Sequence, residues 1–235
     1  MILPQSRCIL LPSNLPPLIL CPRRYLHLKL YTHRIYNLLH TVGKKRLLNK
    51  IREIIVPIID RIGSTFAKTG ISPTGWSVIG LLLAALSGIA YSGLWGDWVL
   101  GGILLLVSGF FDIVDGSVAR VTQTISHRGA FLDSNFDRIA EILVYGGLIS
   151  GAVGEPLVVF TALASSIMVS YARVKSESLN VNVSGIGIGE RAERILILAV
   201  LSIMGFPYYG VIIVIVIASL TFIQRFIYTI KKLEK

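Results

Sequence analysis

Hydrophobic residues gather in six long runs along this chain, and short polar connections separate the runs. The third run, at residues 130–151, carries charged residues in its first turns, so its start is expected at the membrane interface or beside a wet cavity. The fifth run, at residues 193–206, is short and can extend backwards through residues 190–194. A helix needs about 20 mostly apolar residues to cross a bilayer. The runs therefore predict an all-α membrane protein with six transmembrane helices, at residues 74–94, 97–119, 130–151, 156–173, 193–206 and 209–229.

A different pattern precedes the first run. Between Leu47 and Phe66, apolar residues recur at helical spacing, while lysines and arginines occupy the other faces. This pattern favours an amphipathic juxtamembrane helix over residues 43–68 that lies on an anionic membrane surface and is kinked at Pro57. A solvated helix that packs on the rest of the protein is the alternative.

These patterns divide the chain into three parts. Prolines interrupt the apolar stretches of residues 1–42, so no continuous signal-peptide core forms there. We expect a basic, poorly ordered N-terminal extension over 1–42, the amphipathic interfacial helix over 43–68, and the six-helix domain over 72–235.

The composition agrees with a location in a membrane. Hydrophobic residues make up 53% of the chain and charged residues only 15%, against roughly 25% charged residues in soluble domains. The formal net charge is +10, which would also suit a nucleic-acid-binding protein. Such a protein does not carry repeated apolar stretches of bilayer length, so we expect membrane lipids and no nucleic acid as partners.

The distribution of positive charge predicts the orientation of the helices. The connections at 92–98, 152–156 and 206–209 contain no lysine or arginine, whereas the alternate connections and both ends of the chain are basic. Basic segments stay on the cytoplasmic side of a membrane. The sequence therefore predicts a multi-pass protein of the cell membrane with both termini, and the helix ends that the basic connections join, on the cytoplasmic side.

Four aspartates lie near the cytoplasmic ends of the second and third runs. Asp112 and Asp115 are three residues apart, and Asp133 and Asp137 are four apart, so each pair projects from one face of its helix. Ionisable groups are costly in a membrane segment, and four carboxylates would repel one another unless a cation lay between them. Oxygen-only clusters suit hard cations such as Mg²⁺ or Mn²⁺. The alternative is ion pairing with the nearby arginines, which are Arg120, Arg128 and Arg138.

These residues form the string Asp112-x2-Asp115-Gly116-x2-Ala119-Arg120-x8-Gly129-x3-Asp133-x3-Asp137. It resembles the signature of the CDP-alcohol phosphatidyltransferases, and every fixed position of that signature is present. The resemblance implies a six-helix membrane enzyme, usually a homodimer. Such an enzyme transfers the phosphatidyl-type group of a CDP-linked lipid to an alcohol and releases CMP, which makes it a transferase of substituted phosphate groups.

The resemblance also implies roles for individual residues. Asp112, Asp115 and Asp133 would bind a pair of divalent cations, Mg²⁺ or Mn²⁺. Asp137 would lie on or near the second ion and act as the catalytic base that takes the proton of the attacking hydroxyl. The residues implied at the CDP-lipid nucleotide are Gly116, Ala119, Arg120, Ser126 and Gly129, together with Thr74 and Ser77 before them. For the segment around Thr74, the alternative is a helix cap with Pro73 in the first turn.

Two basic strings indicate the acceptor alcohol. One runs from Ser170 to Glu177 and the other from Gly187 to Arg194. Arginine side chains bind phosphate oxygens in a bidentate way, so the strings favour a phosphorylated acceptor. Ordinary cytoplasmic positive charge is the alternative. Both strings resemble those of the phosphatidylinositol-phosphate and archaetidylinositol-phosphate synthases, which implies that the acceptor phosphate is held by Ser170, Arg173, Lys175, Arg191 and Arg194.

The expected reaction is therefore transfer from CDP-diacylglycerol or CDP-archaeol to inositol 1-phosphate. Glycerol 3-phosphate, as in a phosphatidylglycerophosphate synthase, is the alternative acceptor. A cation or proton transporter is the alternative from another class, with the aspartates as its transport site. Transport sites tend to lie near the middle of the bilayer, whereas these acids cluster toward one end of their helices.

Overall fold

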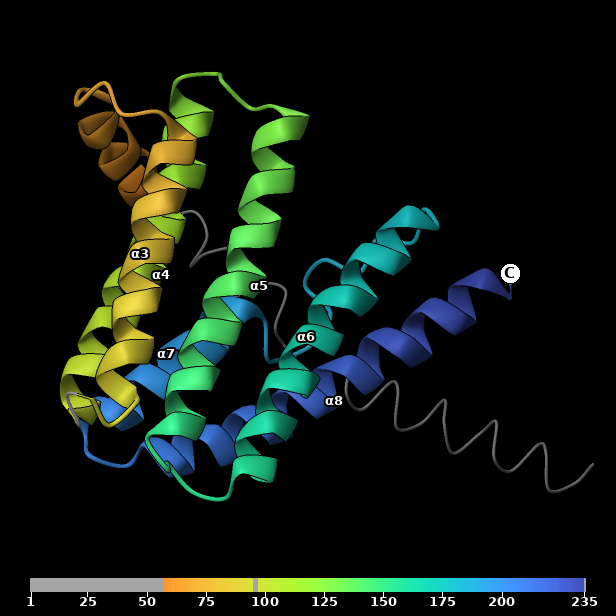
Figure 1. Cartoon of the computed structure of the whole chain (residues 1–235). Helices are drawn as coiled ribbons and strands as arrows, with labels where there is room; N and C mark the ends of the chain where they lie inside the picture. The colour runs from red at the N-terminus through yellow and green to blue at the C-terminus, as the bar shows by residue number, and fades with distance from the viewer. Residues whose placement is uncertain (1–56, 95–96, 235) are drawn as a thin grey trace, which may run out of the picture. The chain divides into compact units, whose positions relative to one another are not determined.

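The computed structural model describes residues 57–94 and 97–234, and every regular element in these ranges is a helix. A helical segment over 57–67 belongs to the predicted amphipathic helix, whereas its earlier part, the kink at Pro57 and the extension 1–42 lie at the edge of or outside the described residues. Figure 1 shows the helices that follow: α3 (Pro73–Tyr91), α4 (Trp98–Val121), α5 (His127–Ser150), α6 (Pro156–Ser178), α7 (Arg191–Ile203) and α8 (Pro207–Leu233).

Each of the six predicted runs overlaps one of these helices, with bounds that differ by up to five residues at either end. The helices α3, α4, α6 and α8 are long and apolar enough to cross a membrane. By the same criteria of length and composition, α5 and α7 are not candidate spans. Helix α5 has 24 residues but carries charged side chains in its first half, and α7 has only 13 residues. The structure therefore supports a multi-pass membrane protein with four candidate spans among the described residues.

Local sequence signals fix where several helices begin. The hydroxyl oxygen of Ser72 accepts a hydrogen bond from the backbone N–H of Gly75, and Pro73 is the first residue of α3. Proline suits that position because its missing N–H would have no partner in the first turn. Helix α5 begins in a related way, since Ser126 accepts from the N–H of Gly129 at 3.0 Å. The cap that was the alternative interpretation of the segment around Thr74 is therefore present.

Helix α3 packs against both α4 and α5, and α7 packs against α4 and α8. The contact between α3 and α5 depends on two glycines. A Cβ atom on Gly147 would collide with the backbone of Gly88, and one on Gly88 would collide with the carbonyl group of Leu143. Small residues let helix backbones approach closely within membranes. This close approach sets the position of α5, which carries two of the four aspartates.

The helical segment 57–67 packs on the same group of helices through aromatic rings. The ring of Phe66 lies edge-on to that of Trp76, with 5.1 Å between centroids, and Trp76 stacks on Phe111 at 5.4 Å. Gly63 lies against Ser117, where a Cβ atom would come within 2.9 Å of the Ser117 backbone. The segment therefore supports the part of α4 that bears the aspartates.

Candidate active site

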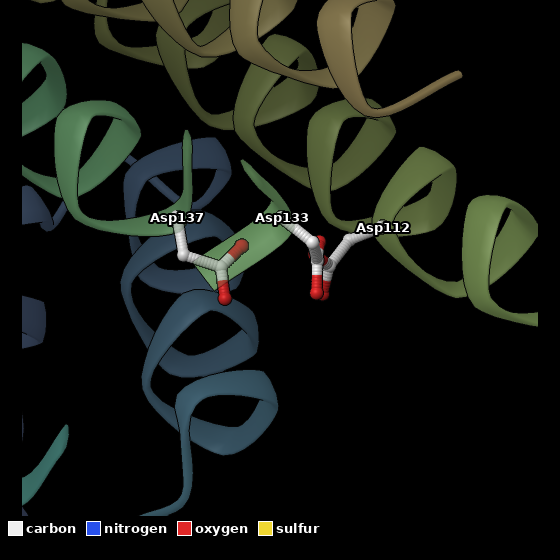
Figure 2. Close-up of side chains that lie close together, drawn as sticks. All are labelled: Asp112, Asp133 and Asp137. Atoms are coloured by element: carbon white, nitrogen blue, oxygen red, sulfur yellow. The ribbon is translucent and has the colours of Figure 1, made fainter. Parts of the chain in front are cut away.

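Three of the four aspartates form a compact cluster between α4 and α5. Asp112, Asp133 and Asp137 can each place one carboxylate oxygen within 4.8 Å of the others. Figure 2 shows Asp112 extending from α4 toward Asp133 on α5, with Asp137 beside them. The cluster results from helical spacing, because residues four apart on α5 share one face, and from the packing of α3 on both α4 and α5.

Asp115 belongs to the same site but has a different partner. Its side chain is buried, and its Oδ2 atom accepts a 2.5 Å hydrogen bond from the hydroxyl of Ser77 on α3. One cavity of about 20 Å³ is lined by all four aspartates and by Ser77. The four carboxylates expected to act together therefore border a single cavity.

A cationic side chain also reaches this cavity. Arg191 is the first residue of α7, and its Nη1 atom lies 2.8 Å from Oδ1 of Asp112 and 2.8 Å from Oδ1 of Asp137. The expected partners of these acids in the alternative interpretation were Arg120, Arg128 and Arg138. Of these, Arg138 approaches Asp137 at 3.4 Å, so the closest ion pairs come instead from a helix distant in sequence.

The residues of the cavity fit a divalent cation. The cluster offers carboxylate oxygens only, which are the ligands that Mg²⁺ and Mn²⁺ prefer. Three carboxylates within 4.8 Å of one another repel strongly in a region of low dielectric constant. The single positive charge of Arg191 does not neutralise Asp112, Asp133 and Asp137 together. The donor set therefore has the chemistry and the charge deficit of a metal site.

A second ion pair lies one helical turn beyond Asp137 along α5. Glu141 on α5 is 8% exposed and receives a 2.9 Å hydrogen bond from Nη2 of Arg194, which is 3% exposed. The Nη1 atom of Arg194 donates to the carbonyl oxygen of Gly189 at 2.8 Å. A second cavity of about 20 Å³ is bordered by Glu141, Arg194 and Arg191. The buried pair therefore adjoins the aspartate site.

Helix α8 holds the connection between α6 and α7. The guanidinium of Arg225, in the interior of α8, donates to the carbonyl oxygens of Ile186 and Val169 at 2.9 and 3.1 Å. Its Nη2 atom also lies 3.2 Å from Oε1 of Glu190, the residue before Arg191. Arg225 is 2% exposed, so it is a buried cation that joins α6 to the segment that leads into α7.

Thr221, one turn earlier on α8, adds to this support. Its hydroxyl oxygen accepts hydrogen bonds from the N–H groups of Ile188 and Gly189 at 3.2 and 2.9 Å. Gly187 has φ +112° and lies against the Thr221 side chain, where a Cβ atom would not fit. The string before α7 therefore follows a path that glycine and α8 determine together.

The residues expected at the nucleotide are placed around the α4–α5 connection and the start of α3. Arg120 is exposed in the last turn of α4, and Gly116 is half-buried one turn before it. Ser77 lines the aspartate cavity. The other members of this group are Ala119 in α4, Ser126 and Gly129 at the start of α5, and Thr74 in the first turn of α3.

The residues expected at the acceptor phosphate are divided between several environments. Arg191 borders the aspartate cavity, and Arg194 is buried against Glu141. Arg173 forms a 3.0 Å ion pair with Glu177 on the exposed side of α6. Ser170 is half-buried and Lys175 is exposed on the same helix. Of the five residues, the structure thus places Arg191 directly at the carboxylates.

Several residues of this region carry no prediction from the sequence. Glu141 lies four residues after Asp137, so its helical face could have been inferred. Arg225 is a lone arginine in an apolar helix, which by itself indicates a functional or structural role inside a membrane. Glu190 lies inside the second basic string but received no role there, and Thr221 gave no signal, because the partners of both residues lie on other elements.

Comparison with known proteins shows what this chain is similar to. The family model described as CDP-alcohol phosphatidyltransferase matches residues 71–223 of the chain. Archaetidylinositol phosphate synthase from Pyrococcus horikoshii is 37% identical over 188 residues, which cover 80% of this chain and 99% of that protein. The protein of the same name from Methanothermobacter thermautotrophicus is 36% identical over 195 residues, with 80% of this chain and 96% of that protein covered.

Solved structures agree with the observed arrangement of helices. The crystal structure of Mycobacterium tuberculosis phosphatidylinositol phosphate synthase in complex with manganese and citrate has a TM-score of 0.64 and 21% sequence identity, covering 73% of this chain and 88% of that chain. The same protein with CDP-DAG bound has a TM-score of 0.64 and covers 74% of this chain and 94% of that chain. These similarities show that the fold is shared.

Proposed function

Because the chain belongs to the CDP-alcohol phosphatidyltransferase family, we propose that it transfers the phosphatidyl-type group of a CDP-linked lipid to inositol 1-phosphate and releases CMP. The lipid is CDP-diacylglycerol or CDP-archaeol. The observation that carries this function is the meeting of four aspartates and Arg191 around one cavity. The similarity to archaetidylinositol phosphate synthases over four fifths of the chain favours inositol phosphate as acceptor.

The carboxylates are the proposed ligands of two divalent cations, Mg²⁺ or Mn²⁺. Asp112, Asp115 and Asp133 would hold them, with Asp137 on or near the second ion. Divalent cations neutralise the negative charge that develops on phosphoryl oxygens during such a displacement. Ser77 fixes the direction of one of these carboxylates through its hydrogen bond to Asp115.

Asp137 is the proposed catalytic base. In the reaction, the acceptor hydroxyl oxygen forms a bond to the phosphorus atom that carries the lipid, and the bond from that phosphorus to CMP breaks. The proton of the hydroxyl passes to the carboxylate of Asp137, and CMP leaves with the electron pair of the broken bond. Positioned bases of this kind contribute about 10²–10⁴-fold to a rate.

Arg191 is the proposed principal ligand of the acceptor phosphate. Its guanidinium lies beside Asp137, so a phosphate bound there would bring its own alcohol close to the base. Planar guanidinium groups bind phosphate oxygens in a bidentate way. Ser170, Arg173 and Lys175 on α6 are proposed to complete the acceptor pocket.

The nucleotide is proposed to lie along the ends of α4 and α5. Arg120 offers an exposed cation in the last turn of α4. A Cβ atom on Gly116 would lie 3.5 Å from Nη1 of Arg120, and one on Gly129 would lie 3.1 Å from Oγ of Ser126. The proposed nucleotide contacts are Gly116, Ala119, Arg120, Ser126, Gly129 and Thr74, with Ser77 acting through Asp115 as well.

We further propose that α5 and α7 also cross the membrane, giving six crossings. Support comes from their packing among the apolar helices α3, α4, α6 and α8. With basic connections on one side, this topology places the termini and the active site in the cytoplasm, at a cell membrane. The enzyme is proposed to act as a homodimer.

A direct assay tests this function. Purified protein in detergent–lipid micelles is given the CDP-lipid, Mg²⁺ and one of four acceptors: inositol 1-phosphate, glycerol 3-phosphate, inositol or serine. We expect CMP release with inositol 1-phosphate alone, and none after EDTA treatment. Release with glycerol 3-phosphate alone would keep the reaction and overturn the acceptor. No release with any acceptor would contradict the proposed function.

A further inference from the structure

Glu141 is a buried acid in α5 to which the signature and the acceptor strings give no role. It lies one helical turn beyond Asp137, on the same face of the helix. Its Oε1 atom is 2.9 Å from Nη2 of Arg194 and 3.9 Å from Nε of Arg191. Glu141 therefore lies within ion-pair distance of both Arg191, which borders the aspartate cavity, and Arg194, one turn later on α7.

The two helices present their charges in register. Asp137 and Glu141 are four residues apart on α5, and Arg191 and Arg194 are three apart on α7, so each pair shares a face. Asp137 meets Arg191 at 2.8 Å, and Glu141 meets Arg194 at 2.9 Å. The Glu141–Arg194 pair therefore repeats the Asp137–Arg191 pair, one helical turn further along both helices.

Stability alone is a weak explanation for the Glu141–Arg194 pair. Glu141 is 8% and Arg194 3% exposed, and the removal of two charges from water offsets most of their mutual attraction. Buried ion pairs in some proteins instead specify one geometry. Here the geometry concerned is that of the first turn of α7, since Arg194 also binds the carbonyl oxygen of Gly189 just before it.

The effect on Arg191 follows from its contacts. Its Nη1 atom lies 2.8 Å from carboxylate oxygens of Asp112 and Asp137, while its Nε atom lies 3.9 Å from Oε1 of Glu141, within ion-pair distance but without a hydrogen bond. If Arg194 did not neutralise Glu141, the free carboxylate would compete for the Arg191 guanidinium and draw it away from the cavity. If Glu141 were neutral, the Nε edge of Arg191 would lose the charge that orients it.

We propose that Glu141 and Arg194 form a positioning pair that fixes the Arg191 guanidinium in the orientation that receives the acceptor phosphate. This inference rests on the proposed function and moves Arg194 from the acceptor pocket to a supporting position. Neither residue of the pair touches a substrate. Their effect is on acceptor binding through Arg191.

The test measures KM for both substrates in the variants Glu141→Gln, Arg194→Met and the double variant. We expect each single variant to raise KM for inositol 1-phosphate about tenfold, the size of one lost charged hydrogen bond, and to leave KM for the CDP-lipid within about twofold. The double variant should be less impaired than Arg194→Met, because it leaves no unpaired carboxylate beside Arg191. Arg194→Lys, which keeps the charge, should recover part of the loss.

Val211→Ala serves as the control, because Val211 is fully buried in α8 near the opposite end of the helices. It should lower the melting temperature and leave the ratio of the two KM values unchanged. The inference is wrong if both KM values rise together in the pair variants, or if the double variant is as impaired as the product of the singles. Wild-type protein that releases no CMP with inositol 1-phosphate would instead overturn the proposed function itself.

Discussion

The hydroxyl of Ser77 donates a 2.5 Å hydrogen bond to Oδ2 of Asp115, joining the second turn of α3 to the aspartates of α4. The sequence associates Ser77 with the nucleotide. In the structure it supports a carboxylate that is a proposed metal ligand. This contact joins α3, which packs on both α4 and α5, to the aspartate cluster between those two helices.

Ser77→Ala should therefore weaken metal binding. Loss of a hydrogen bond that orients a ligand typically lowers metal affinity about 10–100-fold. The measurement is the Mg²⁺ concentration that gives half-maximal CMP release, together with the Mg²⁺-dependent shift in melting temperature. Ser117→Ala is the control, because that hydroxyl bonds to the Val114 carbonyl within α4. A Mg²⁺ dependence equal to that of the wild type would contradict the role given to Ser77.

Asp137→Asn should lower kcat by about 10²–10⁴-fold, because an amide cannot accept the proton of the acceptor hydroxyl. CMP release under saturating substrates measures the effect. Asp97→Asn provides a matched control at the other end of α4, where Asp97 caps the helix by accepting from the N–H of Leu100. Asparagine caps a helix about as well as aspartate, so Asp97→Asn should keep nearly full activity. Nearly full activity in Asp137→Asn would exclude it as the base.

Arg191→Lys should raise KM for inositol 1-phosphate about tenfold or more, because lysine keeps the charge but loses the planar pair of donors. The KM for the CDP-lipid should change little, and the comparison of the two KM values is the measurement. Arg61→Lys, an exposed change in the helical segment 57–67, controls for the substitution. A rise in the CDP-lipid KM alone would assign Arg191 to the nucleotide.

Arg225→Met should destabilise the protein by about 2–4 kcal/mol, since it leaves the carbonyl groups of Ile186 and Val169 and the charge of Glu190 without their shared donor. Thermal unfolding in detergent measures the loss. Adding Glu190→Gln to this variant removes the unpaired carboxylate and should recover part of the stability. A double variant less stable than Arg225→Met would show that this ion pair is not the source of the effect.

Two adjacent glycines of α5 offer a matched test of helix packing. Gly147→Ala should destabilise the protein by about 1–3 kcal/mol through overpacking, because the new methyl group would collide with Gly88 on α3. Gly146→Ala meets no atom within 4 Å and should be neutral or stabilising, since alanine favours a helix over glycine. Equal melting temperatures for the two variants would contradict the close approach of α3 and α5.

The helices and the aspartate pairs could be predicted because they depend on local spacing. Asp112 and Asp115, or Asp133 and Asp137, share a face whatever the rest of the fold does. For the start of α3 the sequence offered a helix cap or a nucleotide contact. The structure shows the cap at Ser72 and a hydrogen bond from Ser77 to Asp115, and the nucleotide contact stays a prediction. The membrane character of α3, α4, α6 and α8 likewise follows from composition along each helix.

The partners of the charged residues could not be predicted in this way. Arg191 and Arg194 lie three residues apart in one basic string, yet one borders the carboxylates and the other is buried against Glu141. Arg225 holds the connection before α7 from another helix altogether. Such contacts join residues far apart in sequence, and their geometry depends on how closely α3, α5, α7 and α8 pack.

By itself, the sequence determined the helical elements, the membrane class, the aspartate motif and the family resemblance, because each of these is encoded in the periodicity and spacing of neighbouring residues. Only the tertiary structure decided that Arg191 is the arginine that meets the aspartates, that Ser77 donates to Asp115, and that Glu141 lies next to Arg191. Those choices depend on burial and on distances between helices, and a buried charge takes whichever partner the packing brings within reach.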